Sequence, residues 1–372
     1  MGQILLRLIK LMERTVVIIH PGSLGDVLLA VPAMRRLLAR FPQHRNLLVS
    51  NEPVGRFLLD CRLFDSWMSV QGAACSDLFV GSFSASTELG RWFTGCDCAV
   101  AWINDEGETL ATALRRCGVR ELWVQSPFSS GLKATHQSDR FLETMGETAG
   151  DGSFDTRVII QADLVAQGLA YCDHMGIPSD RPIVLIHPGS GSSRKCINPK
   201  VLALAMEQFQ REGLHPFILE GPADRESVAN LCRLVPTASI VAGRIALSTV
   251  AGLLVRSALY IGNDSGITHL SGLLGVPTIA LFGPTDPARW APRGPHVVVL
   301  QGRTCLCQSW EQVEACSEKP CFAISAEEIV AVGKKIARLN DTTPRNPSQC
   351  ALSQPNLCAT VPRSFSLSTV TT

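Results

Sequence analysis

The sequence lacks long apolar runs, an excess of charge of either sign, and a large share of aromatic residues. No uninterrupted stretch of about 18 apolar residues occurs, so we expect no membrane-spanning helix. The 34 Lys and Arg residues nearly balance the 33 Asp and Glu residues, which gives a net charge of +1. This balance provides no general basic field for holding nucleic acid, although a local basic patch remains allowed. Aromatic residues make up only 6% of the chain, which disfavours a base-stacking platform.

Three ligand-binding motifs are also absent. The first glycine-containing loop has only Gly22 and Gly25, so it is not a GxGxxG dinucleotide motif, and no GKS or GKT follows it. No Asp-x-Asp sequence occurs, so the usual carboxylate clamp for a divalent ion on a nucleotide sugar is missing. We therefore predict no cofactor and no bound metal, and we expect helix N-termini and basic residues to neutralise any diphosphate.

The first residues show no secretory signal, because charged residues interrupt the apolar ones and no small-residue cleavage site follows. Residues 2–12 instead predict a short basic amphipathic helix. Two interpretations stay open: the helix packs on the first strand, or it contacts a membrane surface.

The 14 cysteines also allow two interpretations, a secreted disulfide framework or free thiols in a reducing compartment. Most stand singly in apolar segments, as Cys117, Cys172 and Cys232 do, which favours free thiols. One group resembles a zinc or iron–sulfur ligand set in number, but its spacing matches no strong template, which favours structural thiols; its members are Cys305, Cys307, Cys316 and Cys321.

With 372 residues, of which 46% are hydrophobic, the chain is long enough for two domains with sizeable cores. Apolar strand-like runs alternate with helical periodicity, which predicts parallel sheets covered by helices on both faces. The expected strands are Thr15–His20, Asn46–Ser50, Ser66–Val70, Cys98–Trp102, Glu121–Val124, Ile183–His187, His215–Leu219, Leu259–Gly262 and Thr278–Leu281.

A small, polar stretch at 146–154 is the expected linker. We therefore predict an N-terminal domain over residues 1–150 and a C-terminal domain over residues 151–339. Residues 340–372, rich in Ser, Thr, Pro and Asn, are expected to form a flexible tail.

A short sequence motif is repeated in the two halves of the chain. HPGSLGD at 20–26 and HPGSGSS at 187–193 each follow a β-branched strand and lead toward a helix. Two such loops at the carboxyl ends of strands predict two Rossmann-like domains that face each other across a cleft, where ligands bind. The alternative is a chance similarity between two common turn sequences.

The first loop places Asp26 in the first turn of a helix. A carboxylate there is often a helix cap, stabilised by the helix dipole. The functional alternative is a general base at the floor of the cleft.

The second loop suits a diphosphate, because Ser190, Gly191 and their neighbours offer backbone N–H groups and hydroxyls, and Arg194 and Lys195 add positive charge. The alternative is a solvated loop with incidental basic residues.

A third segment carries Asp264, Ser265 and Gly266 between a strand and a helix, with His269 one turn further on. The spacing puts Ser265 and His269 on one helical face. His269 is either a phosphate or sugar ligand or a satisfied core histidine. The turn at 283–286 could line the same site.

Together these segments resemble glycosyltransferase family 9, the ADP-heptose:lipopolysaccharide heptosyltransferases. The resemblance rests on three blocks, with weaker similarity near 138–146 and 305–322; the blocks are GSLGDVLLAVPAMRRLLARFP (22–42), HPGSGSSRK with Pro199 (187–199) and GNDSGITHLSGLLGVPTIALFGPTDPARW (262–290). It implies a GT-B fold and inverting, metal-independent transfer of a heptose from an ADP-sugar to the inner core of lipopolysaccharide. It also implies a cytoplasmic enzyme, with peripheral contact at the inner membrane as an open alternative, and no nucleic-acid partner.

The resemblance also implies roles for individual residues. Asp26 would be the general base, with Ser23 and Gly25 on the acceptor side of the same loop. Lys195 would neutralise the diphosphate. The expected donor-binding set also holds Ser190, Gly191, Arg194, Asp264, Ser265, Gly266, His269 and Asp224, with ribose recognition open between Asp224 and Glu226.

The sequence departs from the family pattern after the second loop, where Lys195-Cys196-Ile197-Asn198-Pro199 lacks a Trp and carries one extra residue. Two other functions therefore stay open: a nucleotide-sugar epimerase or hydrolase with the same donor cleft, and a non-catalytic relative that keeps the fold.

Overall fold

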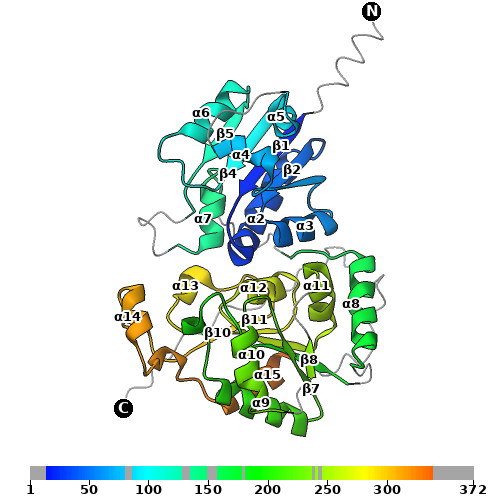
Figure 1. The fold of residues 1–372 in the computed structure, drawn as a ribbon, viewed down its shortest axis with the longest axis vertical. Helices are drawn as coiled ribbons and strands as arrows, with labels where there is room; N and C mark the ends of the chain where they lie inside the picture. The colour runs from blue at the N-terminus through cyan, green and yellow to red at the C-terminus, as the bar shows by residue number, and fades with distance from the viewer. Residues whose placement is uncertain are drawn as a thin grey trace, which may run out of the picture.

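A computed structural model describes residues 14–79, 86–127, 135–148, 157–177, 181–236, 239–241 and 245–337. It has two α/β units, which lie one above the other in Figure 1. Each unit contains a parallel sheet flanked by helices, so the expected fold class is confirmed. The predicted amphipathic helix at 2–12, most of the linker and the tail from residue 340 lie outside the described residues.

The first sheet has strand order β3-β2-β1-β4-β5, and every neighbouring pair is parallel. Its strands are β1 (Thr15–His20), β2 (Arg45–Ser50), β3 (Ser66–Ser69), β4 (Cys96–Ala101) and β5 (Glu121–Val124). All five were expected from the sequence, with shifts of one or two residues at some ends. Their order reverses at β1, which pairs with β2 on one side and β4 on the other.

The second sheet has order β11-β10-β9-β6-β7-β8, again with parallel neighbours throughout. Its strands are β6 (Ile183–His187), β7 (His215–Leu219), β8 (Ser239–Val241), β9 (Leu259–Asn263), β10 (Thr278–Phe282) and β11 (Val297–Gln301). The two edge strands, β8 and β11, were not predicted. β8 has only three residues, and β11 is half-buried, so neither gives a strong burial pattern.

Helices complete both units. Those of the first are α2 (Leu24–Arg40), α3 (Glu52–Asp60), α4 (Ala73–Phe79), α5 (Glu88–Phe93), α6 (Thr109–Arg116) and α7 (Gln137–Glu143). Those of the second are α8 (Ala162–His174), α9 (Pro199–Arg211), α10 (Arg225–Cys232), α11 (Leu247–Arg256), α12 (Gly266–Leu273), α13 (Pro287–Trp290), α14 (Trp310–Ala315) and α15 (Ala326–Ile336), with short 3-10 turns at Ser193–Lys195 and Pro320–Phe322. Among the described residues, no helix has the length and apolar character needed to cross a bilayer.

The hydrophobic core explains why the two units stay together. Along β1, Val16 and Ile18 belong to one buried cluster and Val17 and Ile19 to another, so both faces of the sheet are covered. The first of these clusters continues into the second unit through α12, α8 and α11. In Figure 1, α7, α2 and α3 of the first unit face α13, α12 and α11 of the second.

The chain passes from one unit to the other between α7 and α8. The predicted boundary at residue 150 stays a prediction, because residues 149–156 lie outside the described ranges. Helix α8 packs closely on α11: a Cβ atom on Gly168 would lie 2.5 Å from the Cα of Gly252. Only glycine permits this approach of two helix backbones.

Candidate active site

The two HPGS loops occupy equivalent places in the two units. The first follows β1 and the second follows β6, and each of these strands stands where its sheet order reverses. In open parallel sheets this reversal point leaves a crevice beyond the strand ends, where ligands bind. The third segment follows β9, which pairs directly with β6. The repeated HPGS sequence therefore occupies equivalent positions in the two units.

The N-terminal ends of α2 and α12 meet across the two units. A Cβ atom on Gly266 would lie 2.7 Å from the Cγ atom of Leu24. A Cβ atom on Gly25 would lie 3.1 Å from the imidazole ring of His269. These two glycines let the loops approach closely, and they place the start of α2, which carries Asp26, against the third segment.

Asp26 is half-buried and caps its own helix. Its Oδ2 atom accepts hydrogen bonds from the Ser23 N–H at 3.1 Å and the Ser23 hydroxyl at 2.7 Å. Among the described residues Oδ1 has no hydrogen bond, so one carboxylate oxygen can still accept a proton. The negative charge of Asp26 also acts on the buried imidazole of His269. The capping function is confirmed, and it is compatible with the predicted role as a base.

In the second unit, several polar side chains of the candidate site form hydrogen bonds with Asp264. Its carboxylate accepts hydrogen bonds from the Lys195 ammonium group at 3.0 Å and the Thr285 hydroxyl at 2.8 Å. Its backbone carbonyl accepts one from the Ser190 hydroxyl at 2.5 Å. The second loop, the third segment and the turn after β10 therefore converge on one buried carboxylate. Thr285 lies in the 283–286 turn, which the sequence suggested only as a possible lining segment.

His269 lies beside this carboxylate, with its Nε2 atom 3.9 Å from Asp264 Oδ1. The ring is buried, and its Nδ1 atom has no hydrogen-bond partner among the described residues. Burial lowers the pKa of His269, and the nearby Lys195 charge acts in the same direction, whereas Asp264 and Asp26 oppose the shift. His269 is therefore a neutral imidazole at pH 7, beside Asp264 and within the electrostatic influence of Asp26.

A second buried network supports Ser265. Its hydroxyl lies 3.2 Å from His187 Nδ1, and His187 Nε2 lies 2.7 Å from Asp224 Oδ2. Asp224 Oδ2 also accepts the Gly221 N–H at 2.8 Å. Burial would raise the pKa of Asp224, but the hydrogen bonds from His187 and Gly221 hold it below its ordinary value. The sequence analysis did not identify His187 as a site residue. It could have done so, because His187 has the same position in the repeated HPGS motif as His20.

This network changes the interpretation of Asp224. We expected it to recognise a ribose, but its side chain is 7% exposed and its carboxylate is engaged inside the protein. The arrangement instead makes it a support for His187 and, through His187, for Ser265. Gly191 differs, because a Cβ atom there would meet nothing within 4 Å, so this part of the loop borders open space.

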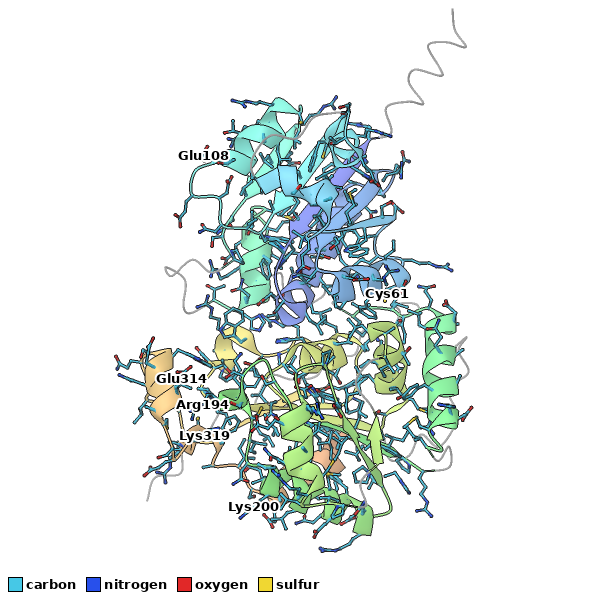
Figure 2. All side chains as sticks on the ribbon, viewed as in Figure 1. Cys61, Glu108, Arg194, Lys200, Glu314 and Lys319 are labelled. Carbon is cyan, nitrogen blue, oxygen red and sulfur yellow. The ribbon has the colours of Figure 1, made fainter. Side chains whose placement is uncertain are left out.

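Arg194 does not join Lys195 at Asp264. It lines a small cavity together with Lys319, Pro284, Val313 and the four clustered cysteines, Cys305, Cys307, Cys316 and Cys321. Figure 2 shows Arg194 and Lys319 close to each other at this side of the second unit. The Lys319 ammonium group donates to the carbonyl of Ser193 at 3.4 Å, which ties the cysteine-bearing segment to the second loop.

The clustered cysteines are free thiols in the structure. Burial and neighbouring thiols raise the pKa of Cys307 and Cys321 to about 11, so both are protonated at pH 7. Within the described ranges, no group of three or more His, Cys, Asp or Glu side chains is arranged to hold a metal ion. Cys117, Cys172 and Cys232 are free thiols as well, as the sequence indicated.

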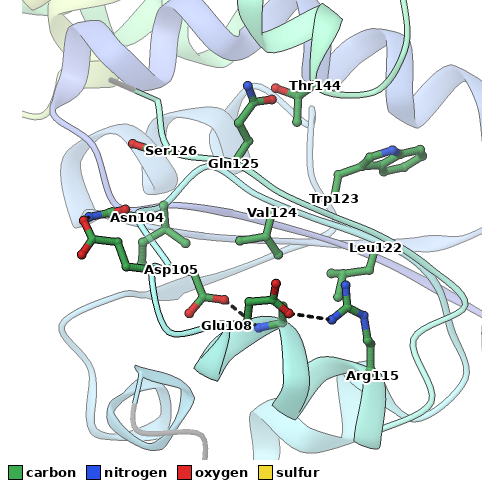
Figure 3. Close-up of a pocket in the computed structure, with 13 residues that line it drawn as sticks. Asn104, Asp105, Glu108, Arg115, Leu122, Trp123, Val124, Gln125, Ser126 and Thr144 are labelled. Carbon is green, nitrogen blue, oxygen red and sulfur yellow. Dashed lines mark hydrogen bonds and ion pairs between the residues drawn. The ribbon is translucent and has the colours of Figure 1, made fainter. Parts of the chain in front are cut away.

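A separate hollow of about 440 Å³ opens in the first unit, beyond the ends of β4 and β5. Figure 3 shows Glu108 and Arg115 on one wall, and Gln125, Ser126 and Thr144 on the other. Glu108 Oε2 lies 3.5 Å from an Arg115 nitrogen. Because β1 ends at the same edge of this sheet, the hollow lies on the side of the unit that carries Asp26.

The chain matches known proteins over much of its length. Residues 156–321 match the family model described as glycosyltransferase family 9 (heptosyltransferase). A relative, lipopolysaccharide heptosyltransferase 3 of Escherichia coli K12, is 24% identical over 213 residues, which is 55% of this chain and 60% of that protein. Another E. coli heptosyltransferase 3 is 26% identical over 125 residues, or 32% of this chain and 36% of that one. The chain thus spans between about a third and three fifths of these two curated relatives.

Solved structures show the same fold. A glycosyl transferase family 9 protein from Veillonella parvula superposes with a TM-score of 0.72 at 20% identity, over 87% of this chain and 97% of that one. The E. coli ADP-heptose lipopolysaccharide heptosyltransferase II superposes with a TM-score of 0.65 at 16% identity, over 87% and 98%. The architecture is the GT-B fold, and residues 156–321 of the chain are similar to glycosyltransferase family 9.

Proposed function

We propose that this protein is an inverting glycosyltransferase that moves a heptose from an ADP-heptose donor to a hydroxyl of the lipopolysaccharide inner core. One observation carries the proposal: Gly25, next to Asp26 in the first unit, lies against His269 of the second, the Asp26 charge acts on the His269 ring, and His269 is beside the Lys195–Asp264 pair. A carboxylate on one wall and a cation on the other are what a single displacement at an anomeric carbon requires. The match of residues 156–321 to the family model and the heptosyltransferase names of the relatives support the choice of sugar.

The first unit supplies the base. Asp26 takes the proton of the acceptor hydroxyl as that oxygen bonds to the anomeric carbon of the heptose. The Ser23 hydroxyl and N–H hold the carboxylate through Oδ2, which leaves Oδ1 to receive the proton. Attack from the side opposite the leaving group inverts the anomeric centre.

The second unit supplies charge relief. The bond between the anomeric carbon and the diphosphate oxygen breaks, and ADP leaves with the electron pair. Lys195 is 28% exposed at its side chain, so its ammonium group can exchange Asp264 for a phosphate oxygen. The N-terminus of α12 also favours negative charge at this point. These groups act without a metal ion in the proposed reaction.

We further propose that the acceptor approaches from the first unit, on the side of Ser23 and Gly25, and that the reaction takes place at the cytoplasmic face of the inner membrane. The donor set is then Ser190, Gly191, Lys195, Asp264, Ser265, Gly266 and His269. Arg194 lies outside this set, beside the clustered cysteines. Asp224 acts indirectly, by holding His187.

Replacement of Asp26 tests the proposal. Asp26→Asn keeps an oxygen for the Ser23 N–H but cannot take the proton, so kcat for heptose transfer should fall by about 10²–10⁴-fold. The Kd for ADP, measured by calorimetry, should stay within about twofold of wild type, because the nucleotide contacts lie on the other unit.

Ser23→Ala is the matched control. It removes the 2.7 Å contact to the same carboxylate while leaving the base in place, so its kcat should fall far less than that of Asp26→Asn. Turnover of Asp26→Asn at the wild-type rate would show that another group takes the proton. A wild-type protein that transfers no heptose from ADP-heptose would contradict the proposed function itself.

A further inference from the structure

The polar hollow of about 440 Å³ in the first unit contains none of the residues assigned to the donor or to the base. The segments after β4 and β5 line it, together with α6 and Thr144 at the end of α7 (Figure 3). Pockets that bind small molecules commonly enclose about 300–1,000 Å³. In open parallel sheets, ligands bind beyond the carboxyl ends of the strands, which is where this hollow lies. Its place and size therefore suit a ligand such as a sugar ring.

A series of short contacts connects the hollow to the start of α2. The Thr144 hydroxyl accepts a hydrogen bond from the Trp102 indole N–H at 3.2 Å. The Trp102 ring lies 5.6 Å from the ring of His20, measured between centroids, and the His20 Nδ1 atom accepts the Gly22 N–H at 3.1 Å. The charge of Asp26 acts on His20 in turn. Two buried rings thus separate the hollow from the proposed base, so a ligand in the hollow is near Asp26 without touching it.

The uncharged side chains of the hollow suit the hydroxyl groups and C–H faces of a sugar. Gln125, directly after β5, lies on the same wall as Thr144 (Figure 3). The side-chain amide of Gln125 makes no hydrogen bond within the described ranges, so its N–H groups and its carbonyl oxygen can all bind a ligand. Sugar hydroxyls both donate and accept hydrogen bonds, as an amide side chain does. Leu122 and Val124 add apolar surface to the lining.

The charged side chains of the lining have a surplus of negative charge. They are three carboxylates, Asp105, Glu106 and Glu108, against one guanidinium, Arg115. Asp105 serves the fold, because its two oxygens accept N–H groups at the start of α6 at 3.0 and 2.9 Å. Glu108 and Arg115 are 3.5 Å apart and 74% and 61% exposed, so their contact contributes little. A phosphate or carboxyl group that enters the hollow therefore meets like charge from Glu106 and Glu108.

We propose that the hollow holds the sugar next to the one that accepts the heptose, and that Glu106 and Glu108 restrict this position to a sugar without phosphate or carboxyl groups. The proposal rests on the proposed function and narrows the class of its acceptor. Gln125 binds the hydroxyls of this sugar, which directs the reacting sugar towards Asp26. Specificity of this kind comes from repulsion of the wrong ligand as well as from attraction of the right one.

The first test changes the charge of the hollow. The double variant Glu106→Gln/Glu108→Gln removes both exposed carboxylates and keeps the shapes of the side chains. The probes are two forms of deacylated lipopolysaccharide core oligosaccharide, one with its phosphates and one from which the phosphates have been removed. For wild type at low salt, KM should be about fivefold or more higher for the phosphorylated form, and this ratio should shrink as salt is added. For the double variant, the two KM values should agree within about twofold.

The matched control for this charge change is Glu327→Gln/Glu328→Gln. It removes two exposed carboxylates from the start of α15, in the second unit, and so changes the net charge of the protein by the same amount. Its KM ratio between the two oligosaccharide forms should equal that of wild type. The proposal is overturned if wild type accepts the phosphorylated form as well as the dephosphorylated one, or if Glu106→Gln/Glu108→Gln keeps the wild-type ratio.

The second test measures binding without a donor, by calorimetry with the dephosphorylated oligosaccharide. Gln125→Leu should raise its Kd by about three- to tenfold, because hydrogen bonds to the sugar are lost. Gln125→Asn keeps a shorter amide and should lie between Gln125→Leu and wild type. Gln208→Leu, at a half-buried position on α9, is the control and should bind like wild type. The Kd for ADP should be unchanged in all three variants, which shows that each of them is folded.

This binding measurement also separates the inference from the proposed function. A wild-type protein that transfers no heptose contradicts the proposed function, but weaker oligosaccharide binding by Gln125→Leu still supports the site in the hollow. Equal binding by wild type and Gln125→Leu contradicts the hollow as a sugar site, even if heptose is transferred. Failure of wild type to bind the dephosphorylated oligosaccharide contradicts it too.

Discussion

The two HPGS loops have the same sequence start and the same place in their sheets, yet their histidines have different surroundings. His20 packs against Trp102 and Phe141, with ring centroids 5.6 and 5.3 Å away. Its Nδ1 atom accepts the Gly22 N–H at 3.1 Å, and its buried Nε2 atom has no partner among the described residues. His187 instead has Asp224 on one ring nitrogen and Ser265 on the other.

The difference shows that the segments packed around each loop, and not the loop sequence itself, determine which hydrogen bonds its histidine makes. In the first unit the histidine serves as an apolar filler that shapes the turn leading to Asp26. In the second unit a carboxylate from the loop after β7 turns the same histidine into a link between Asp224 and Ser265. In the proposed reaction the first loop therefore presents a base, and the second presents an ordered set of polar groups for an anion.

The largest expected effect is the difference in unfolding free energy between variants of the two histidines. His187→Leu would leave the buried Asp224 carboxylate without its main partner, which should lower the free energy of unfolding by about 3–5 kcal/mol. His20→Leu removes one hydrogen bond from a half-buried N–H and should cost about 1–2 kcal/mol. Urea denaturation of both variants against wild type measures the two losses. Equal losses would mean that the buried network adds nothing over apolar packing.

The second prediction uses pH. Burial lowers the pKa of His20 to about 4, against the opposing charge of Asp26. Since the unfolded value is about 6.5, the unfolded chain takes up the proton first as the pH falls, so the stability present above pH 6.5 is lost on the way to pH 4. For His20 this loss is about 3 kcal/mol.

His20→Asn should therefore flatten the pH dependence of the unfolding free energy between pH 6.5 and 4. His136 and His269, whose pKa values burial also lowers, keep a residual slope. The contribution of Asp224 has a different window: its pKa is lowered, so its stabilisation is present above about pH 4 and is lost only in stronger acid. A slope in His20→Asn as steep as that of wild type would show that the buried ring of His20 does not resist protonation.

Much of the fold followed from local pattern. Buried strands such as β1 and β6 are continuous apolar runs, and a parallel sheet with helices on both faces is the arrangement that buries them. The edge strands β8 and β11 were missed because an edge needs less burial and so leaves a weaker pattern. Strand ends that are followed by glycine-containing turns can be recognised in the sequence, and they mark the edge of a parallel sheet where ligands bind. This was enough to expect Asp26, Lys195, Asp264 and His269 in one site.

The remainder depends on contacts between segments far apart in the sequence. No local feature shows that Asp224 turns inward to His187, 37 positions away, or that Thr285 reaches Asp264. The separation of Arg194 from Lys195 is a matter of the short 3-10 turn that carries both, which points adjacent side chains to different places. Pairings of this kind are set by tertiary packing, which sequence periodicity does not record.

The smallest expected effect concerns the approach of the two units. A Cβ atom on Gly266 would lie 2.7 Å from Leu24, so Gly266→Ala must push α12 away from α2. Because misplacement by about 1 Å costs up to about 10²-fold in rate, kcat should fall by about tenfold while the unfolding free energy changes by about 1 kcal/mol or less. Gly107→Ala is the control, since its Cβ atom would meet only the Thr109 hydroxyl at an ordinary 3.4 Å and the residue lies outside the proposed site and the lining of the hollow, so the rate should be kept. If Gly266→Ala transfers heptose as fast as Gly107→Ala does, then close contact between the two loops is not what aligns the base with the donor.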